Sequence, residues 1–258
     1  MQYGVCSLSV IPMRSEPDDR AEMTNQVLFG ETFKVLEQRK KWSRIRLAHD
    51  NYEGWIDNKQ WEQLSENFYN EVQEGAVPVS TEMIEIISHP DSGSFFPVLL
   101  GSMLPKMKKG GQVDLEYTHF DFMGPFSTKT SSRTSLVEYA YQYLNAPYLW
   151  GGRTPLGIDC SGYTQMVYRL TGYPLPRDSA EQARHGITLS FIEESEPGDL
   201  AFFDNEEGII THVGIILSDN YIIHASGKVR LDRLDQTGIF NAEKGMHTHK
   251  LRVIKKVI

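Results

Sequence analysis

The stretch that decides the fold is Tyr148–Tyr163, YLWGGRTPLGIDCSGY. Its first ten residues are rich in Gly and Pro, which is typical of a loop, and apolar side chains then recur at helical spacing over Tyr163–Leu170. Gly172 follows and marks the end of the predicted helix. Cys160 is therefore predicted to lie in or beside the first turn of a buried helix, with Asp159 as its candidate N-cap.

A cysteine at a helix start is favoured as a thiolate, because unpaired backbone N–H groups and the positive end of the helix dipole lie there. Such a thiol also needs a base near neutral pH. The candidate is His212, in the β-branched run Ile209–Leu217, which predicts a strand; a polar break at Ser218–Asn220 and a second predicted strand, Tyr221–Ala225, follow. His224 lies 224 − 212 = 12 residues further on, so a hairpin with an odd-length loop would place the two histidines directly opposite on one face. His224 would then hold the His212 ring in one tautomer.

The other cysteine and histidines are interpreted as structural. Cys6 is predicted to be an inert buried residue, the usual state of a lone cysteine. The same interpretation applies to His49, His89, His119, His185, His247 and His249. His247 and His249 lack a neighbouring carboxylate or Cys that would complete a ligand set, so no metal and no cofactor are predicted.

Five motifs together resemble the NlpC-type cysteine peptidases, which cut peptidoglycan stem peptides with a small papain-like fold. The motifs are Tyr-x-Trp-Gly-Gly at 148–152, Asp-Cys-Ser-Gly at 159–162, Pro-Arg-Asp-Ser at 176–179, Pro-Gly-Asp-Leu at 197–200 and His-Val-Gly-Ile at 212–215. The resemblance covers about residues 130–258. It implies a catalytic set of Cys160, His212 and His224, the last in place of the Asn or Asp of papain-like enzymes. The Cys160 backbone N–H would stabilise the oxyanion, and the Tyr148 hydroxyl either helps or only packs.

The first half of the chain predicts short strands and turns. Val27–Phe29, Phe33–Glu37 and Trp42–Leu47 are rich in β-branched and aromatic residues, which is typical of a small barrel. Residues 20–60 resemble the bacterial SH3-like domain, most specifically in the Gly-Trp pair at 54–55. Val98–Gly101 echoes Val27–Gly30, so a second, diverged barrel repeat is predicted.

The chain is therefore predicted to have an α+β fold in three domains. These are an SH3-like barrel at 1–62, a second, diverged SH3-like barrel at 63–126, and a papain-like domain with N-terminal helices and an antiparallel sheet at 127–258. Small polar residues at 127–132 suit a linker, and apolar spacing over Leu136–Leu144 predicts a helix capped by a preceding Ser or Thr.

The resemblance also implies a substrate. Members that combine SH3-like domains with this catalytic domain cleave stem peptides after γ-linked D-Glu and before a diamino acid, and several act on short peptides with a free N-terminal L-Ala. Their ammonium group needs anionic or hydroxyl partners. The predicted substrate-binding residues are Tyr148, Asp159, Ser161, Asp178 and Ser179 from the catalytic domain, and Tyr52 and Glu22 from the first barrel; for Glu22 a solvated surface charge is the alternative.

Composition limits the other function classes. The 258 residues carry 26 Lys plus Arg and 34 Asp plus Glu, so the net charge of −8 disfavours nucleic acid and anionic lipid as partners. No apolar run is long enough to span a membrane. Cytoplasmic recycling of wall fragments by a monomer is expected, or a secreted or periplasmic location if an export signal has been removed. A non-catalytic wall-binding protein, and an amidase or acyltransferase that uses the same thiol, remain as alternatives.

Overall fold

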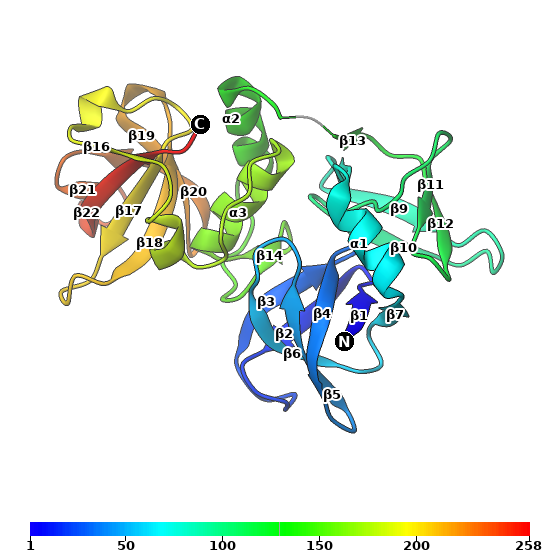
Figure 1. The fold of residues 1–258 in the computed structure, drawn as a ribbon. Helices are drawn as coiled ribbons and strands as arrows, with labels where there is room; N and C mark the ends of the chain where they lie inside the picture. Colours follow the sequence, from blue (N-terminus) through cyan, green and yellow to red (C-terminus); the bar gives the residue numbers. More distant parts are fainter. Residues whose placement is uncertain (129) are drawn as a thin grey trace. The chain divides into compact units, whose positions relative to one another are not determined.

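The computed structural model describes residues 1–128 and 130–258 (Figure 1). The chain divides into two compact units, residues 1–129 and 130–258. The predicted linker at 127–132 includes residue 129, which lies outside the described residues. The three domain ranges given above stay a prediction.

The first unit begins with a seven-stranded antiparallel sheet in the order β3-β2-β6-β5-β4-β1-β7. Its strands are β1 (Gln2–Val5), β2 (Val10–Arg14), β3 (Met23–Leu28), β4 (Thr32–Gln38), β5 (Trp42–Leu47), β6 (Glu53–Asp57) and β7 (Glu62–Leu64). The strands are short and alternate buried with exposed residues, so their inward side chains enclose one small core that includes Ile11, Phe33 and Ile45. Cys6 belongs to this core.

The rest of the first unit is a helix followed by two small sheets. The elements are α1 (Glu66–Glu74), β8 (Val79–Ser80), β9 (Ile84–Ser88), β10 (Phe95–Leu99), β11 (Gln112–Asp114), β12 (His119–Phe122) and β13 (Phe126–Ser127). Strands pair in the order β10-β9-β12-β11 and as β13-β8. Helix α1 was not predicted; it starts at the N-cap Ser65, whose hydroxyl accepts from Phe68 N, and it buries only Tyr69 and Val72. Two buried side chains leave too weak a periodicity to stand out in the sequence.

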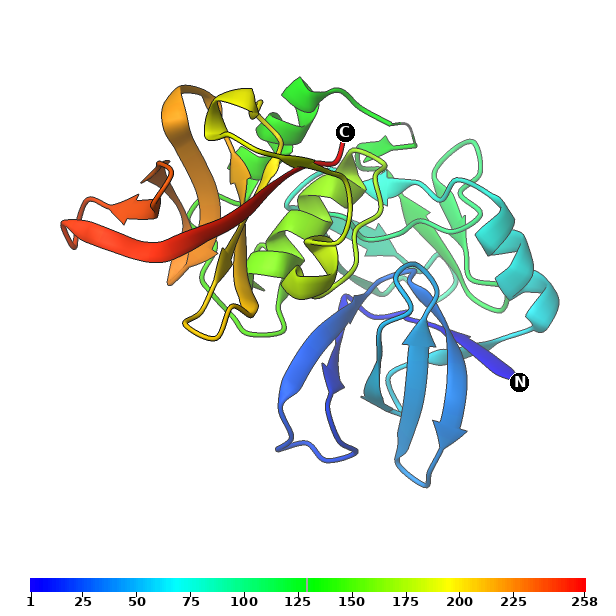
Figure 2. The same cartoon turned by 60° about the vertical axis from the view of Figure 1, so that its left-hand side comes forward.

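The second unit combines helices with an antiparallel sheet. Its helices are α2 (Arg133–Gln142), α3 (Cys160–Leu170), α4 (Ser179–Gln182) and the 3-10 turns η1 (Ile192–Glu194) and η2 (Ser218–Asn220). Its strands are β14 (Arg153–Thr154), β15 (Gly157–Ile158), β16 (Ile187–Leu189), β17 (Leu200–Asp204), β18 (Ile210–Ile216), β19 (Tyr221–Ser226), β20 (Lys228–Leu234), β21 (Gly238–Asn241) and β22 (Met246–Lys256). The sheet order is β16-β22-β17-β18-β19-β20-β21, and β21 also pairs with β22, so six strands close into a barrel (Figure 2).

Helices α2 and α3 pack together, and α3 also packs on β18 and β19 (Figure 1). Both predicted helices are present, and so are their predicted caps: Ser132 caps α2, and Asp159 caps α3. Ten of the eleven residues of α3 are buried, so this helix is the centre of the unit. The predicted α+β fold class is confirmed by this architecture.

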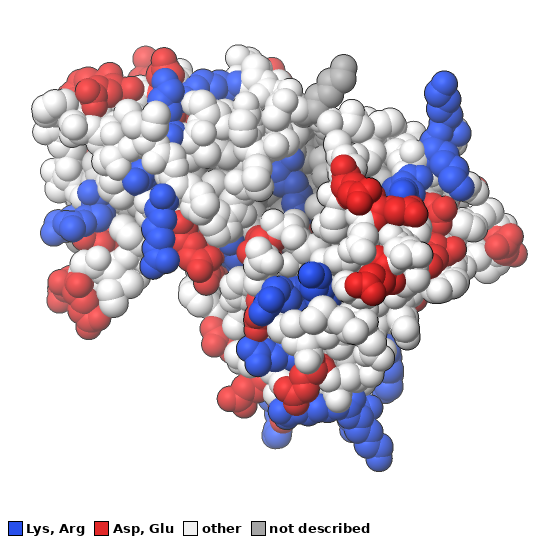
Figure 3. All heavy atoms as spheres, in the orientation of Figure 1, with Lys and Arg blue, Asp and Glu red and all other residues white. Residues whose placement is uncertain are grey.

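Surface charges of both signs are interspersed on the face seen in Figure 3. Within the part of the chain that the structure describes, no helix combines the length and the apolar composition needed to cross a membrane.

Candidate active site

Cys160 is the first residue of α3, as predicted, and it is 6% exposed. Its Sγ lies 4.0 Å from the carbonyl oxygen of Thr211, and the backbone N–H of Val213 is a second polar neighbour of the sulfur. These two residues flank His212 in β18. The sulfur therefore lies against the strand segment that carries the candidate base.

The start of α3 is held by the Asp159 carboxylate. Its Oδ1 accepts from Gly162 N at 2.7 Å, and its Oδ2 accepts from Gly151 N at 2.8 Å. Arg177 donates to both carboxylate oxygens and to Ser161 Oγ, the last at 2.9 Å. Arg177 and Asp159 are 2% and 5% exposed, so this is a buried ion pair. It joins the loop before the cysteine, the helix start and the segment before α4.

Glycine is required where that loop crosses the helix start. A Cβ on Gly162 would lie 2.4 Å from the carbonyl oxygen of Gly152, closer than real Cβ atoms approach an oxygen. The glycine that ends the Asp-Cys-Ser-Gly motif therefore lets the loop backbone approach the first turn of α3 directly.

His212 and His224 are hydrogen bonded. Nε2 of His212 lies 2.8 Å from Nδ1 of His224, and both side chains are buried. The predicted register is wrong, however: His224 pairs with Gly214, so the two histidines are diagonal neighbours on one face. Gly214 makes this contact possible, because a Cβ there would lie 2.8 Å from the Cβ of His224 and would obstruct its ring.

Two further residues, which were not predicted to belong to the site, also contact the histidines. Nε2 of His224 lies 3.0 Å from Oδ2 of Asp232 in β20. His249 of β22, predicted to be structural, stacks on His212 with ring centroids 4.3 Å apart and planes 26° apart. Asp232 could have been recognised as an acidic residue at an inward position of a strand. Arg230 and Arg233 lie close to it in the sequence, however, and a segment with these charges is typical of a strand that faces solvent.

Burial keeps both reacting groups neutral at rest. It raises the pKa of the Cys160 thiol to about 12, with Asp159 adding to the effect and the Val213 N–H and Arg177 opposing it. Burial holds the pKa of His212 well below its ordinary 6.5, and the neighbouring His224 and His249 lower it further by smaller amounts. Burial also lowers the pKa of His249 to about 4. The resting pair is thus a neutral thiol beside a neutral imidazole.

The other predicted site residues lie as follows. Burial raises the pKa of Tyr148 to about 12, and the nearby charges of Cys160 and Asp159 add to this effect. Asp178 is exposed at the start of α4, and Ser179 is the half-buried first residue of that helix. In the other unit, Glu22 is exposed before β3, and Tyr52 packs against the barrel core. Ligand contacts for all of these residues stay a prediction.

Metal binding is the other common use of clustered histidines. Across residues 1–128 and 130–258, no cluster of three or more His, Cys, Asp or Glu side chains is arranged to hold a metal ion.

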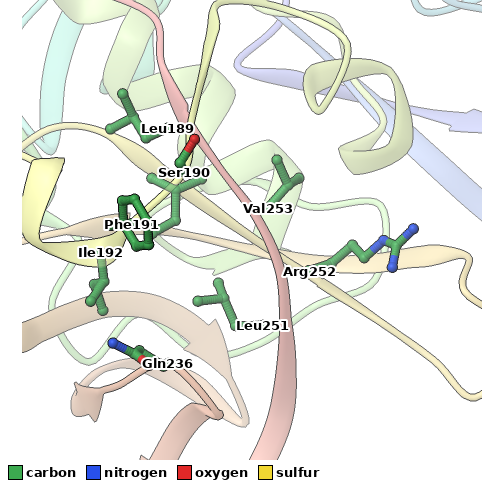
Figure 4. A pocket seen from close by; sticks show the side chains of 9 residues that line it. Leu189, Ser190, Phe191, Ile192, Gln236, Leu251, Arg252 and Val253 are labelled. Carbon is green, nitrogen blue, oxygen red and sulfur yellow. The ribbon is translucent and has the colours of Figure 1, made fainter.

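A separate pocket of about 350 Å³ lies in the same unit (Figure 4). It is lined by Leu189, Ser190, Phe191, Ile192, Gln236, Leu251, Arg252, Val253 and Ile254. None of these residues is a candidate acid, base or activated nucleophile, so the catalytic reaction is not assigned to this pocket.

A buried thiol at a helix start, beside a strand histidine whose far nitrogen bonds a second polar side chain, defines a papain-like cysteine peptidase. Comparison with known proteins agrees. Residues 145–247 match the model of the NlpC/P60 family, and residues 13–60 match that of the bacterial dipeptidyl-peptidase SH3 domain. The chain therefore contains an NlpC/P60 domain preceded by a bacterial SH3-like domain, which confirms the resemblance drawn from its motifs and its assignment as a cysteine peptidase.

Individual relatives cover most of the chain. Dipeptidyl-peptidase 6 of Lysinibacillus sphaericus is 27% identical over 86% of this chain and 88% of its own. The gamma-D-glutamyl-L-lysine dipeptidyl-peptidase of Bacillus subtilis is 26% identical over 78% of this chain and 71% of its own. The crystal structure of an NlpC/P60 family protein from Bacillus cereus aligns with a TM-score of 0.84 at 19% identity over 99% of both chains, which establishes the shared fold.

Proposed function

We propose that the protein hydrolyses the γ-D-glutamyl-diamino acid bond of murein stem peptides that carry a free N-terminal L-Ala. The observation that carries the chemistry is the buried set of Cys160, His212 and His224. The bond specificity is supported by the names of the Bacillus relatives, which act on γ-D-glutamyl-L-lysine. Cytoplasmic recycling of wall fragments is part of the same proposal.

The reaction is an acyl transfer through the Cys160 sulfur. The thiol gives its proton to His212 as the sulfur bonds to the γ-carbonyl carbon, and the backbone N–H of Cys160 stabilises the oxyanion, with the Tyr148 hydroxyl beside it. When the C–N bond breaks, His212 returns the proton to the leaving amine and a thioester remains. Water, deprotonated by His212, then cleaves the thioester and restores the thiol.

Selection for the free amine is assigned to the predicted substrate-binding residues. An ammonium that leaves water needs carboxylate or hydroxyl partners. Asp178 and Ser179 are the proposed partners in the catalytic unit, and Tyr52 and Glu22 of the first barrel stay candidates from the sequence. Asp159 and Ser161 already bond Arg177, so in this proposal they shape the site beside Cys160 through that network.

The test is digestion of L-Ala-γ-D-Glu-L-Lys, with product masses as the readout. We expect the dipeptide L-Ala-D-Glu and free lysine, and an N-acetylated tripeptide should be cut at least about tenfold more slowly, because an uncharged acetamide leaves the carboxylates of the amine site unpaired. Equal rates on the two peptides would contradict the amine site. An intact tripeptide would favour a binding protein, and a product of increased mass would favour an acyltransferase.

The pH profile of kcat/KM should have its acid limb below pH 6.5. The free enzyme is active only while His212 is neutral, and burial holds the pKa of His212 below 6.5, so protonation stops the reaction only under more acidic conditions. Initial rates on the tripeptide from about pH 4 to 8 measure this limb, with circular dichroism at each pH to verify that the protein is folded. A midpoint at or above 6.5 would contradict the neutral resting pair.

A further inference from the structure

The hydrogen-bond chain of the site continues beyond His224 to a buried carboxylate. Asp232 is 5% exposed, and its Oδ2 lies 3.0 Å from Nε2 of His224. The same carboxylate accepts from Arg230, at 2.8 Å from Nε and 3.1 Å from Nη2. Arg230 in turn reaches Glu243 at 3.0 Å. Asp232 therefore accepts hydrogen bonds from two side chains, which fix its carboxylate at the far end of the histidine pair.

An ionised carboxylate can only accept hydrogen bonds, and this decides where the ring protons lie. Burial alone would raise the pKa of Asp232, but the hydrogen bonds from His224 and Arg230 outweigh burial and hold the pKa of Asp232 below its ordinary value. Nε2 of His224 must then carry the proton. Nδ1 of neutral His224 is left as an acceptor, so Nε2 of His212 must donate to it, and the lone pair of His212 is on Nδ1.

We propose that Asp232 is a positioning residue that fixes the tautomers of both histidines, so that Nδ1 of His212 is the base available to the Cys160 thiol. This inference rests on the proposed function of His212 as the base. Without the carboxylate, His224 is free to carry its proton on Nδ1. Nε2 of His212 would then have to accept, which places the His212 proton on Nδ1 and blocks transfer from the thiol.

The charges around the pair agree with this role. The titratable or charged groups that act on the two rings are Arg230 and Asp232 from β20 and His249 from β22. Cys160 of α3 lies against the backbone of Thr211 and Val213, on either side of His212. Burial lowers the pKa of His224, and Asp232 only partly reverses that shift. His224 is therefore neutral near pH 7, which is the state in which its tautomer matters.

The first experiment compares Asp232→Asn with Asp235→Asn. The side-chain amide introduced by Asp232→Asn can donate an N–H to His224, so the tautomers of the two histidines are no longer fixed. We expect kcat on the tripeptide to fall about 10- to 100-fold with little change in KM. Asp235 makes the same kind of contact, 2.8 Å from Nε2 of His247, but on the exposed surface, so its variant should keep parental kcat. Thermal unfolding of both variants verifies that each is folded at the assay temperature.

The second experiment places Asp232→Asn in a His224→Asn background. The amide oxygen introduced by His224→Asn would accept from His212 Nε2, and an amide has no second tautomer that Asp232 would need to exclude. In the His224→Asn background, Asp232→Asn should therefore lower kcat less than about twofold. A general structural role would give the same loss in both backgrounds. Full additivity of the two changes would therefore overturn the proposal.

Nitrogen-15 NMR of the histidine rings gives a readout that does not need activity. In the parent we expect Nε2–H on both His212 and His224, and in Asp232→Asn we expect His224 to shift toward Nδ1–H. An Nδ1-protonated His224 in the parent would overturn the proposal. If the parent protein does not cleave the tripeptide but its ring tautomers are as expected, the proposed function fails while the role of Asp232 in fixing the tautomers holds.

Discussion

Replacing Cys160 with Ala should lower kcat on the tripeptide by about 10⁴-fold or more, because the change removes the only atom that forms the covalent intermediate. Substrate binding should persist, since Ala leaves the Asp159–Arg177 network in place. Calorimetric titration of the variant with intact tripeptide would measure this binding, and product masses would measure the loss of hydrolysis.

Cys6 offers a matched control for that experiment. It is also a buried, free cysteine, but it belongs to the barrel core of the first unit. Burial raises the pKa of its thiol far above the ordinary value, so Cys6 stays a neutral thiol at working pH. Cys6→Ala should keep parental kcat and lower only stability, by about 1 kcal/mol for the small cavity. Hydrolysis that survived in Cys160→Ala, or was lost in Cys6→Ala, would reject Cys160 as the nucleophile.

Local sequence signals predicted the start of α3 because they act within a few residues. Asp159 is an N-cap, Gly152 and Gly162 allow a close backbone approach, and the apolar spacing after Cys160 gives the buried helix face. These features place the thiol without reference to the rest of the chain.

The strand register could not be obtained from the spacing of the histidines alone. The three-residue turn η2 at 218–220 joins Leu217 to Tyr221, whose backbone groups bond at 2.9 Å. This turn sets Gly214 opposite His224 and displaces His212 by two residues. The ring contact survives because Gly214 has no side chain. Turn geometry and glycine placement together decided the register.

Asp232 and His249 were missed for a different reason. They reach the site from β20 and β22, and neither of these strands pairs with β18, the strand that carries His212. His249 comes near His212 because β22 pairs with β17 and β17 pairs with β18, and the two rings then stack. Contacts that depend on the order of strands in a sheet leave no short-range pattern in the sequence.

Removing Arg177 should be the most destabilising single change near the site. Arg177→Met would remove the guanidinium that bonds both oxygens of the buried Asp159 carboxylate, which costs about 3–5 kcal/mol for a broken buried pair. Hydrogen exchange of the α3 amides, followed by mass spectrometry, would measure this as a loss of local free energy of opening. Arg46→Met is the matched control, because Arg46 pairs with Glu53 on the surface and its loss should cost about 0–1 kcal/mol.

The double variant Asp159→Asn/Arg177→Met separates charge from packing. Asn is as good an N-cap as Asp, so Gly162 N keeps an acceptor, and the double variant buries no uncompensated charge. It should therefore recover part of the stability that Arg177→Met loses, as expected where an unpaired buried charge is the main cost. If the double variant were less stable than Arg177→Met, the loss would come instead from the arginine's bonds to Ser161 and to the carboxylate, and the pair would hold the helix start through geometry rather than charge.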